Sequence, residues 1–268
     1  MKKYSYEKAA KFWSNRAKST DPLAAVLTFH APKVLNEIYD RWEKESLKSA
    51  LPHHLKREKA LDLGCGTGRI ALTLAQLKAE VTAVDISNAM LSHLKKKACR
   101  DKLLNRVSLV RSSSAQLPFD KQSFDIITCF GLLEHLPEAV RRKTVFETFR
   151  VLKPNGKMFA VVNNADCIFL QKNYPMTSQK RDGYFVTLVG LKWLEKVCRV
   201  NRLEVKIIAA NPMYALNHYF VSADRKSFFG SEQIFEWYCR NSTRYDFSET
   251  LDNNGLQRLA SHFMVEIT

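Results

Sequence analysis

The sequence predicts an α/β fold in which a mostly parallel β-sheet carries helices on both faces. From about Lys59 onward, short apolar runs alternate with longer amphipathic segments, and this alternation is typical of parallel strands joined by crossover helices. The first of these runs ends in a glycine-rich turn, Gly64 to Gly68, that leads into a helix-like segment. Right-handed crossovers place the carboxyl ends of parallel strands along one edge, where ligands bind. Candidate site residues are therefore sought after each strand.

Each element follows from a local pattern. Before the alternating region, apolar residues between Val34 and Trp42 recur at helical spacing, and Pro32 suits a first helical turn. Strands are expected at Ala60–Leu63, Val81–Val84, Val107–Val110, Phe124–Phe130, Lys157–Val162, Leu203–Ala209 and Phe263–Thr268. Helices are expected at Ile70–Lys78, Asn88–Cys99, Glu138–Leu152 and Leu191–Val200. The polar stretch Lys172–Gly183 is expected to be a loop.

The composition favours one folded cytoplasmic domain. With 268 residues, 46% of them hydrophobic, the chain can bury a sizeable core. The first residues are basic but are followed by no apolar run, so no signal peptide is expected, and no run is long enough to span a membrane. The six cysteines form no C-x-x-C pair, and free thiols in a reducing compartment are the simplest interpretation.

The formal net charge of +15 favours anionic partners. The basic residues are spread along the chain, however, with only short runs such as Lys95–Lys97 and Arg141–Lys143. A solvated helix face explains such runs. Binding to nucleic acid is therefore allowed by the charge but not favoured.

The turn after the first strand is the strongest chemical signal. It reads Leu61-Asp62-Leu63-Gly64-Cys65-Gly66-Thr67-Gly68-Arg69. Glycines let the backbone turn sharply and approach a ligand closely, and the following helix points its amino terminus at the same place. A dinucleotide-binding turn has the spacing G-x-G-x-x-G, which would need a glycine where Arg69 stands. The spacing G-x-G-x-G disfavours NAD.

A second signal is Asp85, at the end of the second strand. An acidic side chain there can accept hydrogen bonds from both ribose hydroxyls of a nucleoside. Ile86 follows it and could pack on an adenine face. The alternative is that Asp85 caps the next helix through the backbone near Ser87.

Three further segments complete the pattern. They are Ser112 to Phe119 after the third strand, Phe124 to Leu136 from the fourth strand onward, and Val151 to Lys157, which is a helix end, a turn and the start of a new strand. Together with the glycine turn and Asp85, in this order, they resemble the class I S-adenosylmethionine-dependent methyltransferases. The resemblance is strongest to the small-molecule subgroup that includes ubiquinone- and menaquinone-pathway enzymes. It implies a doubly wound, Rossmann-like sheet of seven strands whose last strand is antiparallel and inserted near one edge.

The resemblance also implies roles for particular residues toward S-adenosylmethionine. The turn that follows Asp62, with Gly64, Cys65 and Gly66, would face the methionine part of the cofactor. Asp85 would hold the ribose beside Ile86. The residues that would border the adenine and the methyl group are Ser114, Ala115 and Phe130. Many relatives have an aspartate near position 113 or 114, where this chain has serines that accept a hydrogen bond more weakly.

Glu134 and His135 come just after the fourth strand, where an acceptor would meet the methyl group. His135 is the first candidate for a general base because histidine titrates near neutral pH. The alternative is a histidine satisfied by a contact at a helix terminus. Two adjacent ligands without clear partners do not make a metal site, so none is predicted.

The predicted function is methyl transfer to a small-molecule acceptor, with O-methylation slightly favoured. An RNA methyltransferase and a non-catalytic S-adenosylmethionine-binding subunit are the alternatives. The chain is expected to be one domain: a helical cap (1–58), a cofactor-binding core (59–210), an insertion (211–258) and a terminal strand (259–268). The N-terminal helices and the insertion are the natural candidates for a cover over the acceptor. Two interpretations are open for their aromatic residues, which either line an apolar or sugar-stacking pocket or, as is commoner for any single one, pack in the core; they are Tyr4, Tyr6, Trp13, Tyr214, Tyr219 and Trp237.

Overall fold

The computed structural model describes residues 4–27, 33–165, 167, 178–181, 184–211 and 260–268. Its helices are α1 (Tyr6–Arg16), α2 (Lys33–Ala50), α3 (Arg69–Gln76), α4 (Asn88–Arg100), α5 (Glu138–Val151) and α7 (Leu191–Val200), with short 3₁₀-helices η1 (Leu104–Arg106) and η2 (Leu133–His135). Its strands are β1 (Lys59–Leu63), β2 (Glu80–Asp85), β3 (Val107–Arg111), β4 (Phe124–Cys129), β5 (Leu152–Asn163), β6 (Ser178–Arg181), β7 (Tyr184–Val186), β8 (Val205–Asn211) and β9 (His262–Ile267). The expected insertion, with Tyr214, Tyr219 and Trp237, lies almost wholly outside the described residues.

Seven strands form one sheet in the order β3-β2-β1-β4-β5-β9-β8. Strands β1 to β5 pair in parallel, whereas β9 runs antiparallel between β5 and β8. The expected α/β sheet with an antiparallel last strand near one edge is confirmed. The order reverses direction at β1, with β2 on one side and β4 on the other, and ligands bind at such a switch point in open α/β sheets.

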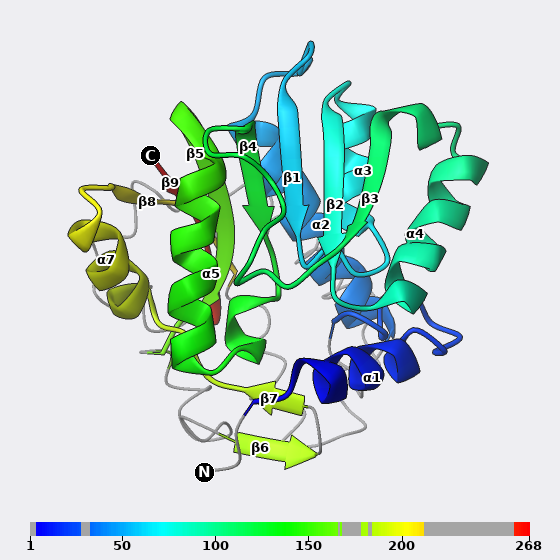
Figure 1. Ribbon diagram of the computed structural model, residues 1–268, viewed down its shortest axis with the longest axis horizontal. Helices are drawn as coiled ribbons and strands as arrows, with labels where there is room; N and C mark the ends of the chain where they lie inside the picture. Colours follow the sequence, from blue (N-terminus) through cyan, green and yellow to red (C-terminus); the bar gives the residue numbers. More distant parts are fainter. Residues whose placement is uncertain (1–3, 28–32, 166, 168–177, 182–183, 212–259) are drawn as a thin grey trace, which may run out of the picture.

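The sheet has a buried core on each face. Along β5, Met158 and Ala160 belong to the core beneath α5 and α7. Phe159 and Val161, which alternate with them, pack toward α2, α3 and α4 on the opposite face. Figure 1 shows α5 in front of the sheet and α2 and α3 behind it, with α1 and β7 lying below the ends of the parallel strands. The strand ends therefore meet α1 and β7 rather than open solvent.

Two sequence-based expectations need correction. The expected loop Lys172–Gly183 contains β6, which pairs with β7 in a two-stranded antiparallel sheet through Ser178↔Val186 and Arg181↔Tyr184. Its polar sequence lacks the alternation that would indicate a strand. The helix expected to continue to Leu152 ends at Val151, and β5 begins at once, with a register shift against β4.

The described helices include none that is long and apolar enough to cross a membrane. The five cysteines that lie among the described residues are free thiols, four of them buried. Burial raises the pKa of the Cys65 and Cys129 thiols well above the usual value. These thiols are therefore held in their neutral form.

Candidate active site

A pocket lies at the carboxyl edge of the sheet, where β1, β2 and β4 end. Most of the predicted site residues line it: Asp62, Gly64, Cys65, Gly66, Asp85, Ile86, Ser114, Phe130 and His135. Tyr4, Tyr6 and Trp13 of the N-terminal segment also line it. Ala115 and Glu134 are not among its lining residues. The pocket thus joins the predicted cofactor residues to the predicted base.

The glycine turn is shaped by contacts that leave no room for side chains. Gly64, Gly66 and Gly68 all have positive φ, at 72°, 51° and 85°. A Cβ on Gly66 would lie 2.8 Å from Cγ1 of Val26, and one on Gly68 would collide with Leu94. The amides of Gly64 and Cys65 both donate to the Val84 carbonyl, at 2.8 and 2.9 Å. The turn is therefore fastened to the end of β2 and presents bare backbone to the pocket.

Asp62, at the end of β1, ties three elements together. Its Oδ2 accepts from the Ala71 amide in the first turn of α3 at 3.0 Å, and its Oδ1 accepts from the Thr128 hydroxyl of β4 at 2.8 Å. The side chain is buried, and burial raises the pKa of its carboxyl to about 6 despite these donors. Asp62 thus fixes the start of α3 beside the turn and lines the pocket at the same time.

Asp85 ends β2 with both carboxylate oxygens held by backbone amides. Oδ2 accepts from Gly66 at 2.9 Å and Oδ1 from Ser87 at 2.8 Å. Burial raises the pKa of this carboxyl, and the backbone donors oppose that effect. The cap of α4 is Ser87 itself, whose hydroxyl accepts from the Met90 amide at 3.3 Å. Because each carboxylate oxygen has two lone pairs, Asp85 keeps acceptor capacity for hydroxyl groups in the pocket.

The serine segment after β3 forms another wall of the pocket. Ser112, Ser113 and Ser114 line it. Ser114 Oγ lies 2.8 Å from the Thr144 hydroxyl of α5, and Ser113 Oγ accepts from the Ala115 amide at 3.2 Å. Sequence reasoning singled out Ser114 and Ala115 here, whereas the structure adds the hydroxyl groups of Ser112 and Ser113.

His135 belongs to η2, directly after β4, and its ring is held in place. Nδ1 lies 3.0 Å from the carbonyl oxygen of Phe185 in β7. A carbonyl oxygen only accepts, so Nδ1 carries the proton and Nε2 of the neutral ring is free of one. The ring packs edge-on against Trp13 of α1, with centroids 4.9 Å apart, and lies 5.5 Å from the ring of Tyr184. This arrangement leaves Nε2 as a proton acceptor.

Glu134 contributes through its backbone: its carbonyl accepts from the Thr187 amide at 2.8 Å, which fastens the chain after β7 to η2. Its side chain is half-buried and makes no hydrogen bond within the described part of the chain. No three His, Cys, Asp or Glu side chains come together as metal ligands would in that same part.

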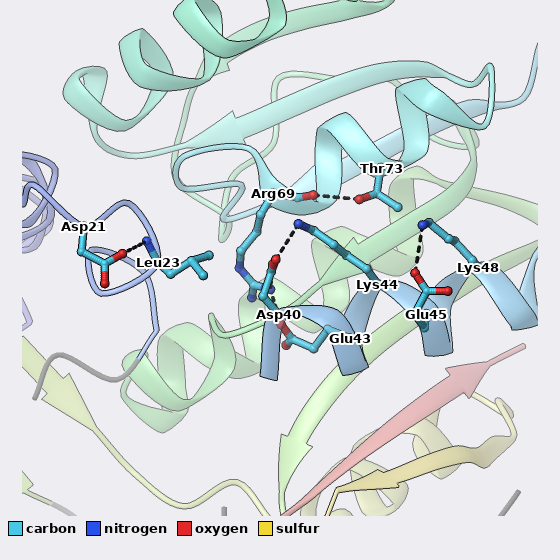
Figure 2. Close-up of polar contacts among 9 residues, drawn as sticks. All are labelled: Asp21, Leu23, Asp40, Glu43, Lys44, Glu45, Lys48, Arg69 and Thr73. Atoms are coloured by element: carbon cyan, nitrogen blue, oxygen red, sulfur yellow. Dashed lines mark hydrogen bonds and ion pairs between the residues drawn. The ribbon is translucent and has the colours of Figure 1, made fainter. Parts of the chain in front are cut away.

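Arg69 is a pocket residue that sequence reasoning treated only as a missing glycine. It begins α3, and its Nη1 donates to Glu43 of α2 and lies 3.4 Å from Oδ1 of Asp40. Figure 2 shows these side chains converging between α2 and α3, with Lys44 bonded to Asp40 at 2.6 Å. Burial alone would lower the pKa of Arg69, but the two carboxylates raise it, so the guanidinium stays charged. The ion pair spans 26 residues of sequence, which no local motif reveals.

Arg16 organises the N-terminal side of the pocket. Its guanidinium donates to the carbonyls of Ala25 at 2.9 Å and Leu27 at 3.1 Å, and also to that of Ala24. These bonds hold the segment after α1 around the Arg16 side chain. In this segment, Val26 packs against Gly66. The same segment is joined to the core by the Ser14 and Ser87 hydroxyls, 2.9 Å apart.

Comparisons with known proteins agree with this geometry. Residues 60–156 match the family described as a methyltransferase domain. The ubiquinone/menaquinone biosynthesis C-methyltransferase of Bartonella quintana is 34% identical over 148 residues, which are 53% of this chain and 55% of that protein. The mitochondrial ubiquinone biosynthesis O-methyltransferase of Schizosaccharomyces pombe is 38% identical over 104 residues, 38% of this chain and 36% of that protein.

Residues 60–156 therefore form a methyltransferase domain, which resembles the class I S-adenosylmethionine-dependent enzymes. The chain spans about half the length of the curated relatives it matches first. The fold of the methyltransferase domain is shared with the solved structure of geranyl diphosphate C-methyltransferase from Streptomyces coelicolor. That likeness has a TM-score of 0.62 at 18% identity and covers 98% of this chain and 96% of the other.

The residues of the methyltransferase domain fit its cofactor. The glycine turn offers a cradle that a Cβ would fill, and Asp85 keeps lone pairs for a ribose diol beside it. Ile86 and the serine segment line the same pocket, as a bound adenine requires. S-adenosylmethionine supplies a methyl group on a sulfonium, which needs no further activation from the protein. The residues have to bind, orient and, for some acceptors, take up a proton.

Proposed function

We propose that the chain transfers a methyl group from S-adenosylmethionine to a small-molecule acceptor that carries an aromatic or quinol ring. The observation that carries this proposal is that one pocket is lined both by Asp85 and by His135. Asp85 would hold the ribose, and the glycine turn at Gly64–Gly66 the methionine part. Phe130, 5% exposed at the end of β4, would form the wall beside the methyl group.

The aromatic character of the acceptor is supported by Trp13 and His135, which both line the pocket. Their rings cluster with that of Tyr184, which is not among the lining residues and stacks on Phe12, with ring centroids 4.8 Å apart. Aromatic walls favour planar apolar rings through offset and edge-to-face contacts. The relatives named above act in ubiquinone and menaquinone biosynthesis, which supports the same class of acceptor and gives no support to RNA.

His135 is proposed as the general base. Its Nδ1 is committed to the Phe185 carbonyl, so Nε2 can accept a proton from an acceptor hydroxyl as the methyl group is transferred. O-methylation is our preferred chemistry because a phenolic hydroxyl uses such a base directly. The relatives include both a C- and an O-methyltransferase, and a base also serves ring methylation by removing a hydroxyl proton from the quinol.

The test uses the purified chain with S-adenosylmethionine labelled in the methyl group. Demethylated quinols and simple catechols are offered as acceptors, and bulk RNA is included as a separate acceptor. We expect label in a quinol or catechol product together with S-adenosylhomocysteine, and NMR of the product separates a methoxy group from a ring methyl. Cofactor binding without transfer to any acceptor, including those in a cell extract, would instead indicate a non-catalytic binding subunit.

A further inference from the structure

Arg69 is the one fixed cation among the described residues that line the pocket; the other charged side chains there are Asp62 and Asp85, with His135 at the acceptor side. The side chain of Arg69 is 8% exposed and lies at the start of α3, next to the glycine turn. A guanidinium that lines a ligand pocket can bind an anionic group on the ligand through charge-assisted hydrogen bonds. The proposed donor carries one such group, the carboxylate of its methionine part.

Only one of the three nitrogens of the Arg69 guanidinium makes polar contacts with other side chains of the described residues. Both of its carboxylate contacts, to Glu43 and to Asp40, are made by Nη1. Within the described part of the chain, Nε and Nη2 make no hydrogen bond, although a guanidinium offers five N–H groups in a fixed fork. Neither nitrogen is a fully buried atom without a partner. Because Arg69 lines the pocket, these N–H groups can meet a ligand there.

The Glu43 carboxylate indicates that the cluster does more than neutralise the charge of Arg69. Glu43 is buried, one of its oxygens is bonded to Arg69, and the other has no partner among the described atoms. Asp40 is already balanced by Lys44 on the same helix. Replacing such a buried pair by apolar residues is often neutral or stabilising, so stability alone does not account for it. Its effect here is to fix the direction of the Arg69 fork (Figure 2).

We propose that Arg69, oriented by Glu43 and Asp40 of α2, binds the carboxylate of the S-adenosylmethionine methionine moiety. The inference rests on the proposed function, because it assumes that donor. It makes α2, which lies outside the matched methyltransferase region at 60–156, part of the cofactor site. Arg69 is the binding residue, and Glu43 is a positioning residue that acts through it.

The test compares the binding of S-adenosylmethionine with that of decarboxylated S-adenosylmethionine, which keeps the sulfonium and the ammonium but lacks the carboxylate. By calorimetry, the wild-type chain is expected to bind the complete cofactor about tenfold or more tightly, as a charge-assisted hydrogen bond implies. The double variant Glu43→Gln/Arg69→Met, which leaves no buried charge unpaired, should bind both compounds with nearly equal affinity. Its affinity for the decarboxylated compound should stay near the wild-type value.

The exposed pair Arg100–Asp101 at the end of α4 provides a matched control, since Arg100→Met/Asp101→Asn removes one ion pair away from the pocket. This variant should discriminate between the two compounds as the wild type does. Arg69→Lys keeps the charge beside Glu43 but loses the fork. It should also lose most of the discrimination, and it serves if circular dichroism shows that the double variant does not fold.

Two results would overturn the inference and leave the proposed function standing. One is a wild-type chain that binds both compounds equally well. The other is a double variant that is folded but loses affinity for both compounds in the same proportion, as a purely structural ion pair would predict. Absence of any S-adenosylmethionine binding by the wild type would overturn the proposed function itself.

Discussion

At the residue scale, the Asp85 carboxylate is shared between two backbone amides and the proposed ribose. Asp85→Ala removes the acceptor for the ribose and also the partner of the Gly66 amide. We expect affinity for S-adenosylmethionine, measured by calorimetry, to fall about tenfold or more, because a charge-assisted bond contributes about 1.5–3 kcal/mol. Asp120→Ala, at an exposed position, is the control and should bind as the wild type does. Unchanged affinity in Asp85→Ala would remove the ribose role.

A change at His135 should affect turnover, whereas a change at Asp85 should affect the affinity for the cofactor. His135→Ala should lower turnover of a hydroxyl acceptor by about a hundredfold or more, the lower range for a general base. Cofactor affinity should remain nearly intact. His54→Ala, an exposed histidine before β1, should change neither quantity. Undiminished turnover in His135→Ala would show that the hydrogen bond to Phe185 only anchors the chain after β4.

The role of a single residue was predictable from the sequence where a local motif indicates it. Gly64, Gly66 and Asp85 follow directly from strand-end patterns, and all three line the pocket. Glu43 and Val26 were not predictable, because each acts through a contact with a residue far away in the sequence. Periodicity places such residues on a helix or in a turn but does not show what they touch.

At the element scale, the start of α3 depends on a glycine that a side chain cannot replace. Gly68→Ala places a Cβ into the buried Leu94 side chain and forces an L-residue to φ +85°. Positive φ costs about 1–2 kcal/mol and overpacking about 1–3 kcal/mol. Urea denaturation should therefore show a free energy of unfolding lower by about 2–5 kcal/mol, together with weaker cofactor binding.

Gly131→Ala is the matched control for Gly68→Ala. Its φ is +70°, but a Cβ there meets nothing closer than Glu134 Oε1 at 3.9 Å. Only the backbone cost of about 1–2 kcal/mol is expected. Equal losses in the two variants would mean that the contact with Leu94 relaxes freely.

The central elements were predictable because their signals are local. Buried parallel strands read as short apolar runs, and the ends of β1 to β4 fall within a few residues of the expected positions. The β6–β7 hairpin gave no such signal. It lies beside η2, and its hydrogen bonds to that element, through Phe185 and Thr187, join parts of the chain that are about 50 residues apart.

At the scale of the whole molecule, strand alternation predicts a parallel sheet but not the order of its strands. The place of β9 between β5 and β8 followed from the family resemblance rather than from periodicity, since the pairing of distant strands leaves no local pattern. The position of α1 beneath the strand ends is likewise a tertiary result (Figure 1). The division into cap, core, insertion and terminal strand stays a prediction, since residues 212–259 lie outside the described part.

The free energy of unfolding should depend on pH through Asp62, which joins β1, α3 and β4. Burial raises the pKa of its carboxyl from 3.8 to about 6 in the folded chain, so the folded state binds the proton more tightly than the unfolded state does. The contribution of this group to stability is therefore fully present below pH 3.8 and is lost as pH rises to about 6. Asp62→Asn cannot titrate and lacks this loss.

The free energy of unfolding of Asp62→Asn, relative to that of the wild type, should therefore increase between pH 4 and pH 7 by up to about 3 kcal/mol, since one pKa unit is worth about 1.4 kcal/mol. Other groups with raised values, such as Glu43, titrate in both proteins and cancel in the comparison. Urea denaturation at several pH values measures the difference. A difference that does not change with pH would mean that the Thr128 and Ala71 donors offset the cost of burying the Asp62 carboxylate, so that its ionisation is no harder in the folded than in the unfolded chain.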